Sequence, residues 1–273
     1  MKKSWASILT MMIGVTASMP TLAQEDEDLG MLQQQGPSQG DLGDIAEVHV
    51  PEGFFFTDGD GSRVIMELMQ NPTSQDEMGF LAPTNMEWFL LFEFDEAGYI
   101  SDDEKDSLDA DAMLDSIEEG NEMGNKERQK RGWAPLRITG WQQAPRYNPD
   151  THNLEWAVKA ESEGEEIINW NTRLLGRRGV MKVTLVTDPE SLLTTLPKSA
   201  ALLADFAYKR GHQYAEFRKG DKIAKYGLSA LVVGGATAVA LKSGAFKWLW
   251  KVLVVAGVAV GGLFKSIFGR KKG

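Results

Sequence analysis

Apolar and polar side chains alternate most regularly between residues 136 and 187. Leu154, Trp156, Val158 and Ala160 alternate with charged or polar neighbours, which is typical of a strand with one buried and one solvated face. Four strand-like segments occur in this region, at residues 136–141, 154–160, 167–174 and 180–187. Because the turns between them are short, the pattern predicts an antiparallel meander.

Further strands and helices precede this meander. Residues 45–50 and 86–94 have the composition of strands, and residues 62–69 have that of a short helix. Residues 106–130 favour a longer helix, because acidic side chains crowd its first half and basic side chains its last turns, which matches the helix dipole.

After the meander, Asp188 and Pro189 are typical of a helix start. Pro197 then predicts a break before a second helix over residues 198–208. Helices on both sides of a four-strand run predict an α+β fold, with an antiparallel sheet flanked by helices and a C-terminal transmembrane tail. This order of elements is similar to the small helix–sheet–helix folds of photosystem-associated periplasmic proteins, an analogy of fold alone.

The two ends of the chain differ from its middle. Lys2 and Lys3 precede a short apolar run that ends at Ala23, which predicts a secretory signal peptide cleaved after that residue. The alternative, an uncleaved anchor, needs about 20 apolar residues. Residues 24–44 are rich in Gln, Gly, Asp and Glu, so we expect a flexible acidic leader there.

Two apolar stretches lie near the C-terminus, at residues 227–241 and 248–264, and Lys251 lies inside the second. Each is short for a bilayer span, and a hairpin of buried helices is the alternative to insertion. We expect a single full crossing, with the other stretch interfacial or re-entrant; a two-span hairpin would leave the basic C-terminal residues outside, against the positive-inside bias.

Charge is divided between the middle and the tail. Residues 24–206 hold 14 basic and 37 acidic side chains, a net charge of −23, whereas residues 207–273 hold 13 basic and 2 acidic ones, a net charge of +11. An acidic domain with a basic, apolar tail is typical of an exported protein held near anionic lipid. Because a domain with this negative charge would repel phosphate backbones, we expect no nucleic-acid partner.

These observations predict a division of the chain into six parts. They are a signal peptide at residues 1–23, the leader at 24–44, an exported α+β domain at 45–208, a basic juxtamembrane segment at 209–226, membrane segments at 227–268 and a basic tail at 269–273. We expect the chain to lie in a bacterial inner membrane, with its main domain in the periplasm.

Several short motifs, in this order, resemble those of an uncharacterised bacterial family. They are Gly140-Trp141, Pro145-Arg146-Tyr147, Leu154-Glu155-Trp156-Ala157, Asn169-Trp170-Asn171-Thr172-Arg173-Leu174-Leu175-Gly176-Arg177, Gly179-Val180, and Gly220-Asp221-Lys222-Ile223-Ala224-Lys225-Tyr226-Gly227-Leu228. Proteins of this family are described as predicted membrane-anchored proteins with a domain of unknown function. The resemblance covers most of the chain from Pro51 onward, and it implies an envelope location and a membrane tail but no reaction.

Catalytic and metal-binding motifs are not recognisable in the sequence. The chain has no Cys, and its three histidines, His49, His152 and His212, are too scattered for a metal-binding pair. Asp58 and Asp60 imitate the start of a calcium loop, but Arg63 stands where such a loop needs Gly. No phosphate-binding loop, dinucleotide fingerprint or nucleophile elbow is present. We therefore predict no catalytic residues, no metal and no cofactor.

One cluster of aromatic, amide and guanidinium side chains suggests a ligand site. Such a platform suits a carboxylate, a phosphate or a sugar. The structural alternative, which we favour, is that the neighbouring Trp156 packs the core while the arginines pair with acids of the domain. The candidate ligand-binding residues are Trp141, Tyr147, Asn169, Asn171, Arg173, Arg177 and Arg178.

The sequence favours a membrane-tethered envelope module that binds another component rather than an enzyme. Its expected partners are the membrane and another envelope protein. The small-residue spacing of Gly257 and Gly261 suits packing between two helices of one chain or between two copies of the chain. Because small residues are frequent in membrane helices, the alternative for this spacing is that it has no role. The alternative is an envelope hydrolase that uses Asp or Glu carboxylates; a buried pocket with two facing carboxylates of perturbed pKa would favour it.

Overall fold

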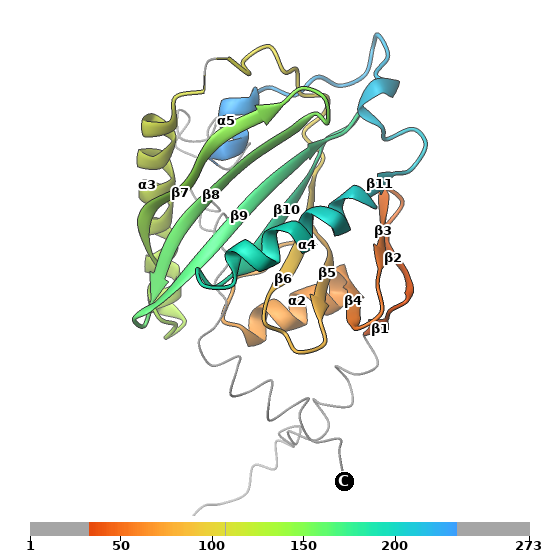
Figure 1. Ribbon diagram of the computed structural model, residues 1–273. Helices are drawn as coiled ribbons and strands as arrows, with labels where there is room; N and C mark the ends of the chain where they lie inside the picture. The colour runs from red at the N-terminus through yellow and green to blue at the C-terminus, as the bar shows by residue number, and fades with distance from the viewer. Residues whose placement is uncertain (1–32, 107, 234–273) are drawn as a thin grey trace, which may run out of the picture.

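The computed structural model describes residues 33–106 and 108–233, and its largest element is an eight-stranded antiparallel sheet (Figure 1). The strand order is β1-β4-β5-β6-β10-β9-β8-β7. The strands span Gln34–Gln35 (β1), Phe54–Asp58 (β4), Glu77–Pro83 (β5), Phe89–Asp95 (β6), Val180–Thr187 (β10), Glu165–Leu175 (β9), Asn153–Ser162 (β8) and Arg137–Asn148 (β7). The predicted meander is confirmed as β7 to β10, and the sheet-rich α+β class is confirmed with it.

A second sheet of three strands lies beside the first, in the order β11-β3-β2. Its strands are Ala207–Tyr208 (β11), Ala46–Val50 (β3) and Ser38–Leu42 (β2). Strand β2 lies within the residues that were expected to form a flexible leader. The structure differs there because β2 pairs with β3 along its whole length and points Gly40 and Leu42 inward. The strand is therefore ordered although it buries few apolar atoms. Residues 1–32, including the expected signal peptide, lie outside the described residues.

Four α-helices and a short 3-10 helix complete the described part of the chain: Gly59–Leu68 (α2), Ala110–Lys130 (α3), Leu192–Ala204 (α4), Tyr214–Glu216 (η1) and Leu228–Val232 (α5). Helix α4 crosses one face of the large sheet, and α2, α3 and α5 cover the other (Figure 1). None of these helices combines the length and the apolar character that a bilayer crossing requires.

Each face of the large sheet carries a hydrophobic core, and strand β10 shows how one strand contributes to both. Val180 and Val186 face the core under α2, α3 and α5, which we call core 1. Met181, Val183 and Leu185 face core 2, on the side of α4 and the small sheet. Burial of each such side chain stabilises the fold by about 1.5–3 kcal/mol, which explains why this strand reads as an almost continuous apolar run.

Helix α4 differs from the two helices that Pro197 predicted. It is one helix with Pro197 inside it. A proline in this place removes the hydrogen bond to the carbonyl of Leu193 four residues earlier. Both residues face solvent, and Leu193 is 85% exposed, so water can serve that carbonyl instead. The buried side chains Leu192 and Leu202 hold the helix on the sheet across the proline.

The described fold also runs past Tyr208, the expected end of the domain. Residues 209–226 pack against the sheet end: Ile223 forms a backbone bridge with Tyr99, and the Tyr226 hydroxyl donates to Asp95 Oδ2 at 2.6 Å. The first expected membrane segment begins at residue 227, yet Leu228 and Val232 of α5 are fully buried in core 1. Residues 234–273, with the rest of the expected membrane segments, Gly257 and Gly261, lie outside the described residues.

Candidate functional site

Three of the predicted site residues lie together on strand β9. Asn169, Asn171 and Arg173 alternate along the strand and therefore point to the same face, toward core 1. Each of the three is at least 96% buried. This part of the predicted cluster is thus brought together by the strand, but beneath the surface rather than on an open platform.

Arg173 has more hydrogen-bonding capacity than its surroundings use. Its guanidinium lies 4.5 Å from the ring centroid of Trp156, and Nη2 donates to Asn171 Oδ1 at 3.4 Å. Its Nε has no hydrogen-bond partner, nor has either side-chain atom of Asn169. Burial lowers the pKa of Arg173 to about 10, whereas the neighbouring Glu93 acts in the opposite direction. Unpartnered buried polar atoms are costly, so this cluster weakens the fold locally.

Arg173 also belongs to a row of charges that crosses four strands. The register places Arg173 opposite Lys182, Lys182 opposite Glu93, and Glu93 opposite Glu77. Lys182 Nζ lies 3.7 Å from Glu93 Oε1, and Arg63 Nη1 lies 3.7 Å from Glu77 Oε2. Burial raises the pKa of Glu93, and Lys182 opposes that rise. Each carboxylate thus has a cation of its own, which is the arrangement of an ion row rather than of an acid–base pair.

Arg177 and Arg178 lie at the end of β9, away from the amides. Arg177 Nε and Nη2 donate to the two carboxylate oxygens of Asp221 at 2.7 and 2.8 Å. Arg177 and the backbone N–H of Arg218 lower the pKa of Asp221 to about 2. Arg178 is exposed, and its carbonyl accepts a hydrogen bond from Gly98 N at 3.0 Å. Arg177 therefore pairs with an acid of the segment that was expected to follow the domain.

Trp141 and Tyr147 are held in two further places along β7. Trp141 Nε1 donates to the Ala110 carbonyl at the start of α3, at 3.3 Å. The Tyr147 hydroxyl lies 3.1 Å from both Asp102 Oδ2 and His152 Nδ1. Burial and the bond to Asp102 raise the pKa of Tyr147. The seven predicted residues therefore do not form one platform: three are buried together, and four serve separate structural contacts.

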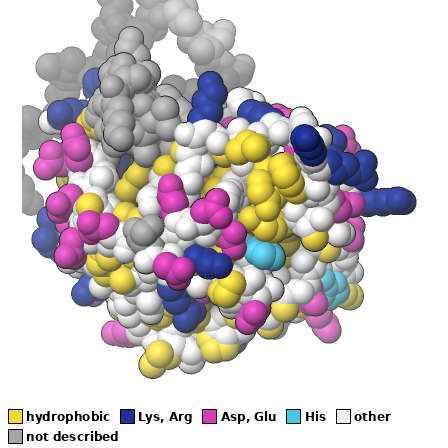
Figure 2. Space-filling model, turned by 90° about the horizontal axis from the view of Figure 1, so that it is seen from above, with side chains coloured by type: hydrophobic (Ala, Val, Ile, Leu, Met, Phe, Trp, Pro, Cys, Tyr) yellow, Lys and Arg dark blue, Asp and Glu magenta, His cyan; other side chains and the backbone are white. Residues whose placement is uncertain are grey.

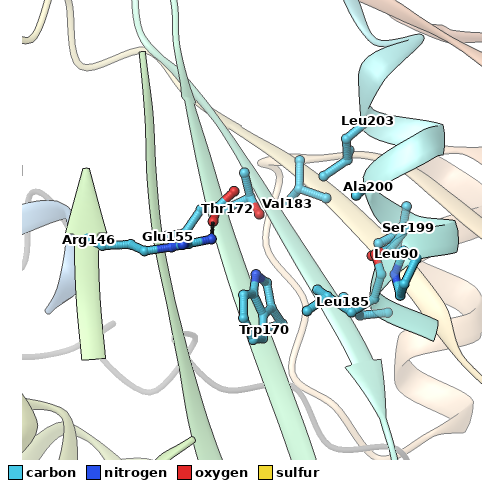
Figure 3. A pocket seen from close by; sticks show the side chains of 12 residues that line it. Leu90, Arg146, Glu155, Trp170, Thr172, Val183, Leu185, Ser199, Ala200 and Leu203 are labelled. Atoms are coloured by element: carbon cyan, nitrogen blue, oxygen red, sulfur yellow. Dashed lines mark hydrogen bonds and ion pairs between the residues drawn. The ribbon is translucent and has the colours of Figure 1, made fainter. Parts of the chain in front are cut away.

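The opposite face of the same strands contains a groove that the sequence did not indicate. It has a volume of about 280 Å³ and lies between α4 and the sheet (Figure 3). Two cross-strand rows form its floor, one of Arg146, Glu155, Thr172 and Val183, the other of Trp170, Leu185 and Leu90. Its wall is the side of α4 that carries Leu196, Pro197, Ser199, Ala200 and Leu203.

The groove is apolar along its length and charged at one end. Trp170 lies between the helix side chains and the ion pair in which Arg146 Nη2 donates to Glu155 Oε2 at 2.8 Å (Figure 3). The Arg146 side chain is 62% exposed, so most of its donors face solvent. The Ser199 hydroxyl donates to the Leu196 carbonyl, which leaves little polar capacity in the helix wall. Such a site suits a ligand with an apolar body and a polar end.

Alternation along β9 was the signal for this floor. Trp170 and Thr172 lie between Asn169, Asn171 and Arg173, so they had to face the other side of the sheet from the amides. The groove itself needs α4 above that face, and no local pattern specifies where α4 packs.

Metal and carboxylate chemistry find little support in residues 33–106 and 108–233. No group of three or more His, Asp or Glu side chains there is placed to hold a metal ion. Asp58, which imitated a calcium ligand, caps α2 by accepting a hydrogen bond from Gly61 N at 3.0 Å. Glu93 and Glu77 face each other across β6 and β5, but neither lines the groove.

Comparisons with known proteins give a family and a distant structural likeness. Residues 34–264 match the model of a family described as a protein of unknown function (DUF2167), which confirms the resemblance to an uncharacterised family. No curated protein matches the chain. The solution structure of cyanobacterial PsbP (CyanoP) from Synechocystis sp. PCC 6803 is 12% identical, and the match covers 65% of this chain and 91% of that chain with a TM-score of 0.41. A likeness of this size transfers no function.

Proposed function

The chain belongs to the DUF2167 family, whose description assigns no activity, and we propose its function from the groove and from the sequence of its ends. It is an exported, membrane-tethered binding module of the bacterial envelope, with its main domain in the periplasm. Its ligand is an amphiphile with a single apolar chain and an anionic end, which binds between α4 and the sheet.

The tether rests on sequence. A signal-like N-terminus, a domain with a net charge of −23 and a tail with a net charge of +11 suit a protein that is held at an anionic membrane surface. The apolar stretch at residues 248–264, which lies outside the described residues, is the segment that we propose to cross the bilayer.

The apolar groove with one charged end is the observation that carries the binding function. A volume of about 280 Å³ is near the lower limit of ligand pockets, which run from about 300 to 1,000 Å³. This size favours one chain or one ring over a larger body. Arg146 offers a guanidinium at the open end, and its free donors suit a carboxylate or phosphate. An uncharged ligand would form no ion pair with the Arg146 guanidinium.

Photo-crosslinking tests this proposal in the full chain, reconstituted in lipid nanodiscs. The probe is dodecanoic acid with a diazirine on its terminal carbon. We expect crosslinks on groove residues such as Trp170, Leu196 or Leu203, and competition by unlabelled dodecanoic acid. Crosslinks spread over the lipid-facing surface, without enrichment in the groove, would contradict the binding function.

Two neighbouring alanines of α4 provide a matched pair of variants. Ala200 lines the groove, whereas Ala201 is exposed and does not line it. We expect Ala200→Trp to fill the groove and abolish the specific crosslinks, and Ala201→Trp to leave them unchanged. Arg146→Gln should weaken competition by dodecanoic acid by about threefold to fivefold, as fits an exposed charge contact, and should leave competition by dodecanol unchanged.

A further inference from the structure

The segment at residues 209–226 combines basic charge with exposed apolar side chains. It holds six basic and two acidic residues. Among the described residues the exposed large apolar side chains are Val64, Leu68, Leu193, Phe217 and Ile223, and the last two belong to this segment. Phe217 is 36% exposed and Ile223 is 63% exposed.

Phe217 and Ile223 both lie next to Tyr99, so they belong to the same region of the surface. The Phe217 ring centroid lies 4.1 Å from that of Tyr99, and Ile223 forms a backbone bridge with Tyr99. Tyr214 stacks on the same ring at 4.6 Å. Figure 2, which looks down on this end of the molecule, shows hydrophobic side chains gathered in a patch that has Lys and Arg along its outer border.

The acidic residues of the segment are engaged in hydrogen bonds within the domain. Asp221 is bound by Arg177, and Glu216 Oε2 accepts hydrogen bonds from the backbone N–H groups of Gly211 and Gln213. The basic side chains of Arg210, Arg218, Lys219 and Lys225 are exposed. The segment therefore uses its negative charge internally and presents its positive charge to solvent.

We propose that this surface, formed by Phe217, Ile223 and the surrounding basic side chains, rests on an anionic lipid bilayer. Exposed apolar side chains enter the interface while neighbouring Lys and Arg side chains attract anionic headgroups. This inference rests on the membrane tether proposed above and adds which face of the domain meets the lipid. In sequence the segment precedes α5, which is buried in core 1, and residues 234–273 with the proposed membrane crossing follow α5.

Acidic side chains limit the extent of this contact. Asp102, Asp103, Glu104 and Asp106 belong to a loop near α5, and Glu104 Oε2 accepts a hydrogen bond from Ser229 N. Figure 2 shows carboxylates on the side of the patch opposite the basic border. An anionic bilayer repels these carboxylates, so the domain meets the lipid at a tilt, with the edge around residues 217–225 inserted.

Single cysteines test the orientation without interference, because the chain has no native Cys. Ala215→Cys places a label beside Phe217, and Ala201→Cys places one on the exposed side of α4 as a matched control. Each variant of the full chain carries an environment-sensitive NBD fluorophore in nanodiscs of phosphatidylcholine, with or without phosphatidylglycerol. Lipids with doxyl groups near the headgroup serve as quenchers.

We expect doxyl quenching of the label at residue 215 to exceed that at residue 201 by at least about twofold in discs with phosphatidylglycerol, and to weaken at high salt. Reversing Arg218, Lys219 and Lys225 to Glu should remove the difference. Reversing Lys130, Arg137 and Lys198, which are exposed elsewhere, should preserve it.

Two failures have separate meanings. Equal quenching at both positions, in protein that stays with the discs after an alkaline wash, would overturn this orientation and leave the tether standing. Protein that the alkaline wash releases from the discs would overturn the tether, and the orientation with it. Quenching at residue 215 that does not depend on phosphatidylglycerol would overturn the role of the basic side chains.

Discussion

Arg177 and Asp221 form a two-hydrogen-bond ion pair that fastens the segment before α5 to the end of β9. The same carboxylate accepts a third hydrogen bond from Arg218 N at 2.7 Å, which closes the turn at residues 218–221. One aspartate thus shapes a local turn and joins it to a strand 44 positions away. This is one of the contacts that hold the surface that we assign to the membrane against the end of the sheet.

Asp221→Asn should loosen residues 209–226 before it destabilises the whole domain. The amide removes the charge that Arg177 binds, so backbone N–H groups of the segment should exchange faster, while those of β8 and β9 stay protected. Hydrogen exchange read by mass spectrometry checks this. Glu216→Gln is the control, because the Glu216 carboxylate accepts its hydrogen bonds from Gly211 N and Gln213 N, and it should leave residues 218–221 protected.

The pH dependence of this ion pair follows from the pKa of Asp221, which is lowered to about 2. An aspartate in an unfolded chain has a pKa of about 3.9. Because the folded-state value is the lower one, the stabilisation is fully present above about pH 4 and is lost as the pH falls toward 2. We expect the exchange rates of wild type and Asp221→Asn to converge over this window. A difference that persists at pH 2 would contradict the assignment.

Leu42→Ala should cost about 2–5 kcal/mol of unfolding free energy, because Leu42 is fully buried in core 2. Urea denaturation of the full chain checks this figure. Gln35→Ala, an exposed position of β1, is the control and should change stability by less than about 0.5 kcal/mol. A Leu42→Ala variant as stable as wild type would restore the flexible leader for residues 33–44.

Local patterns predicted strands that have one buried and one solvated face. Strand β8 was found because Trp156 and Val158 alternate with polar side chains. Strand β5 was missed because Glu77, Gly79 and Pro83 interrupt its apolar run, whereas β6 and β10 were found as nearly continuous apolar runs. Strand β2 was missed because only Gly40 and Leu42 are buried on its inner face, so its apolar pattern is weak. The hydrogen bonds to β3 hold the strand in place.

The candidate site shows the same limit more strongly. Sequence reasoning selected Asn169, Asn171 and Arg173 by chemical type, and the strand does bring them together. The sequence could not show that these three side chains would be buried. Their burial depends on the pairing of β6 with β10 and on the packing of α5 in core 1, and both contacts join residues far apart in the chain. The groove on the other face depends equally on where α4 packs.

Arg173→Met should leave the unfolding free energy unchanged or raise it by about 1 kcal/mol. Methionine keeps the apolar contact with Trp156 and removes a buried charge with its unpartnered Nε, while Glu93 keeps Lys182 as its cation, so no carboxylate of the row loses its ion-pair partner. Arg173→Ala removes the contact as well, so we expect a loss of about 2–4 kcal/mol. Thermal and urea denaturation of both variants check the order. A large loss in the methionine variant would show that the charge itself holds this part of the sheet.

Glu93 gives the opposite pH dependence to Asp221. Burial raises the pKa of Glu93 in the folded state, so its ionised form is disfavoured there relative to the unfolded chain, where the pKa is about 4.3. The domain therefore gains stability from this group as the pH falls through the raised folded value toward the unfolded one. A glutamine at this position cannot titrate, so the stability of wild type relative to Glu93→Gln should be higher at pH 5 than at pH 8. Urea denaturation of both proteins at each pH measures that difference. A difference that shrinks as the pH falls would mean that Lys182 outweighs burial at this site.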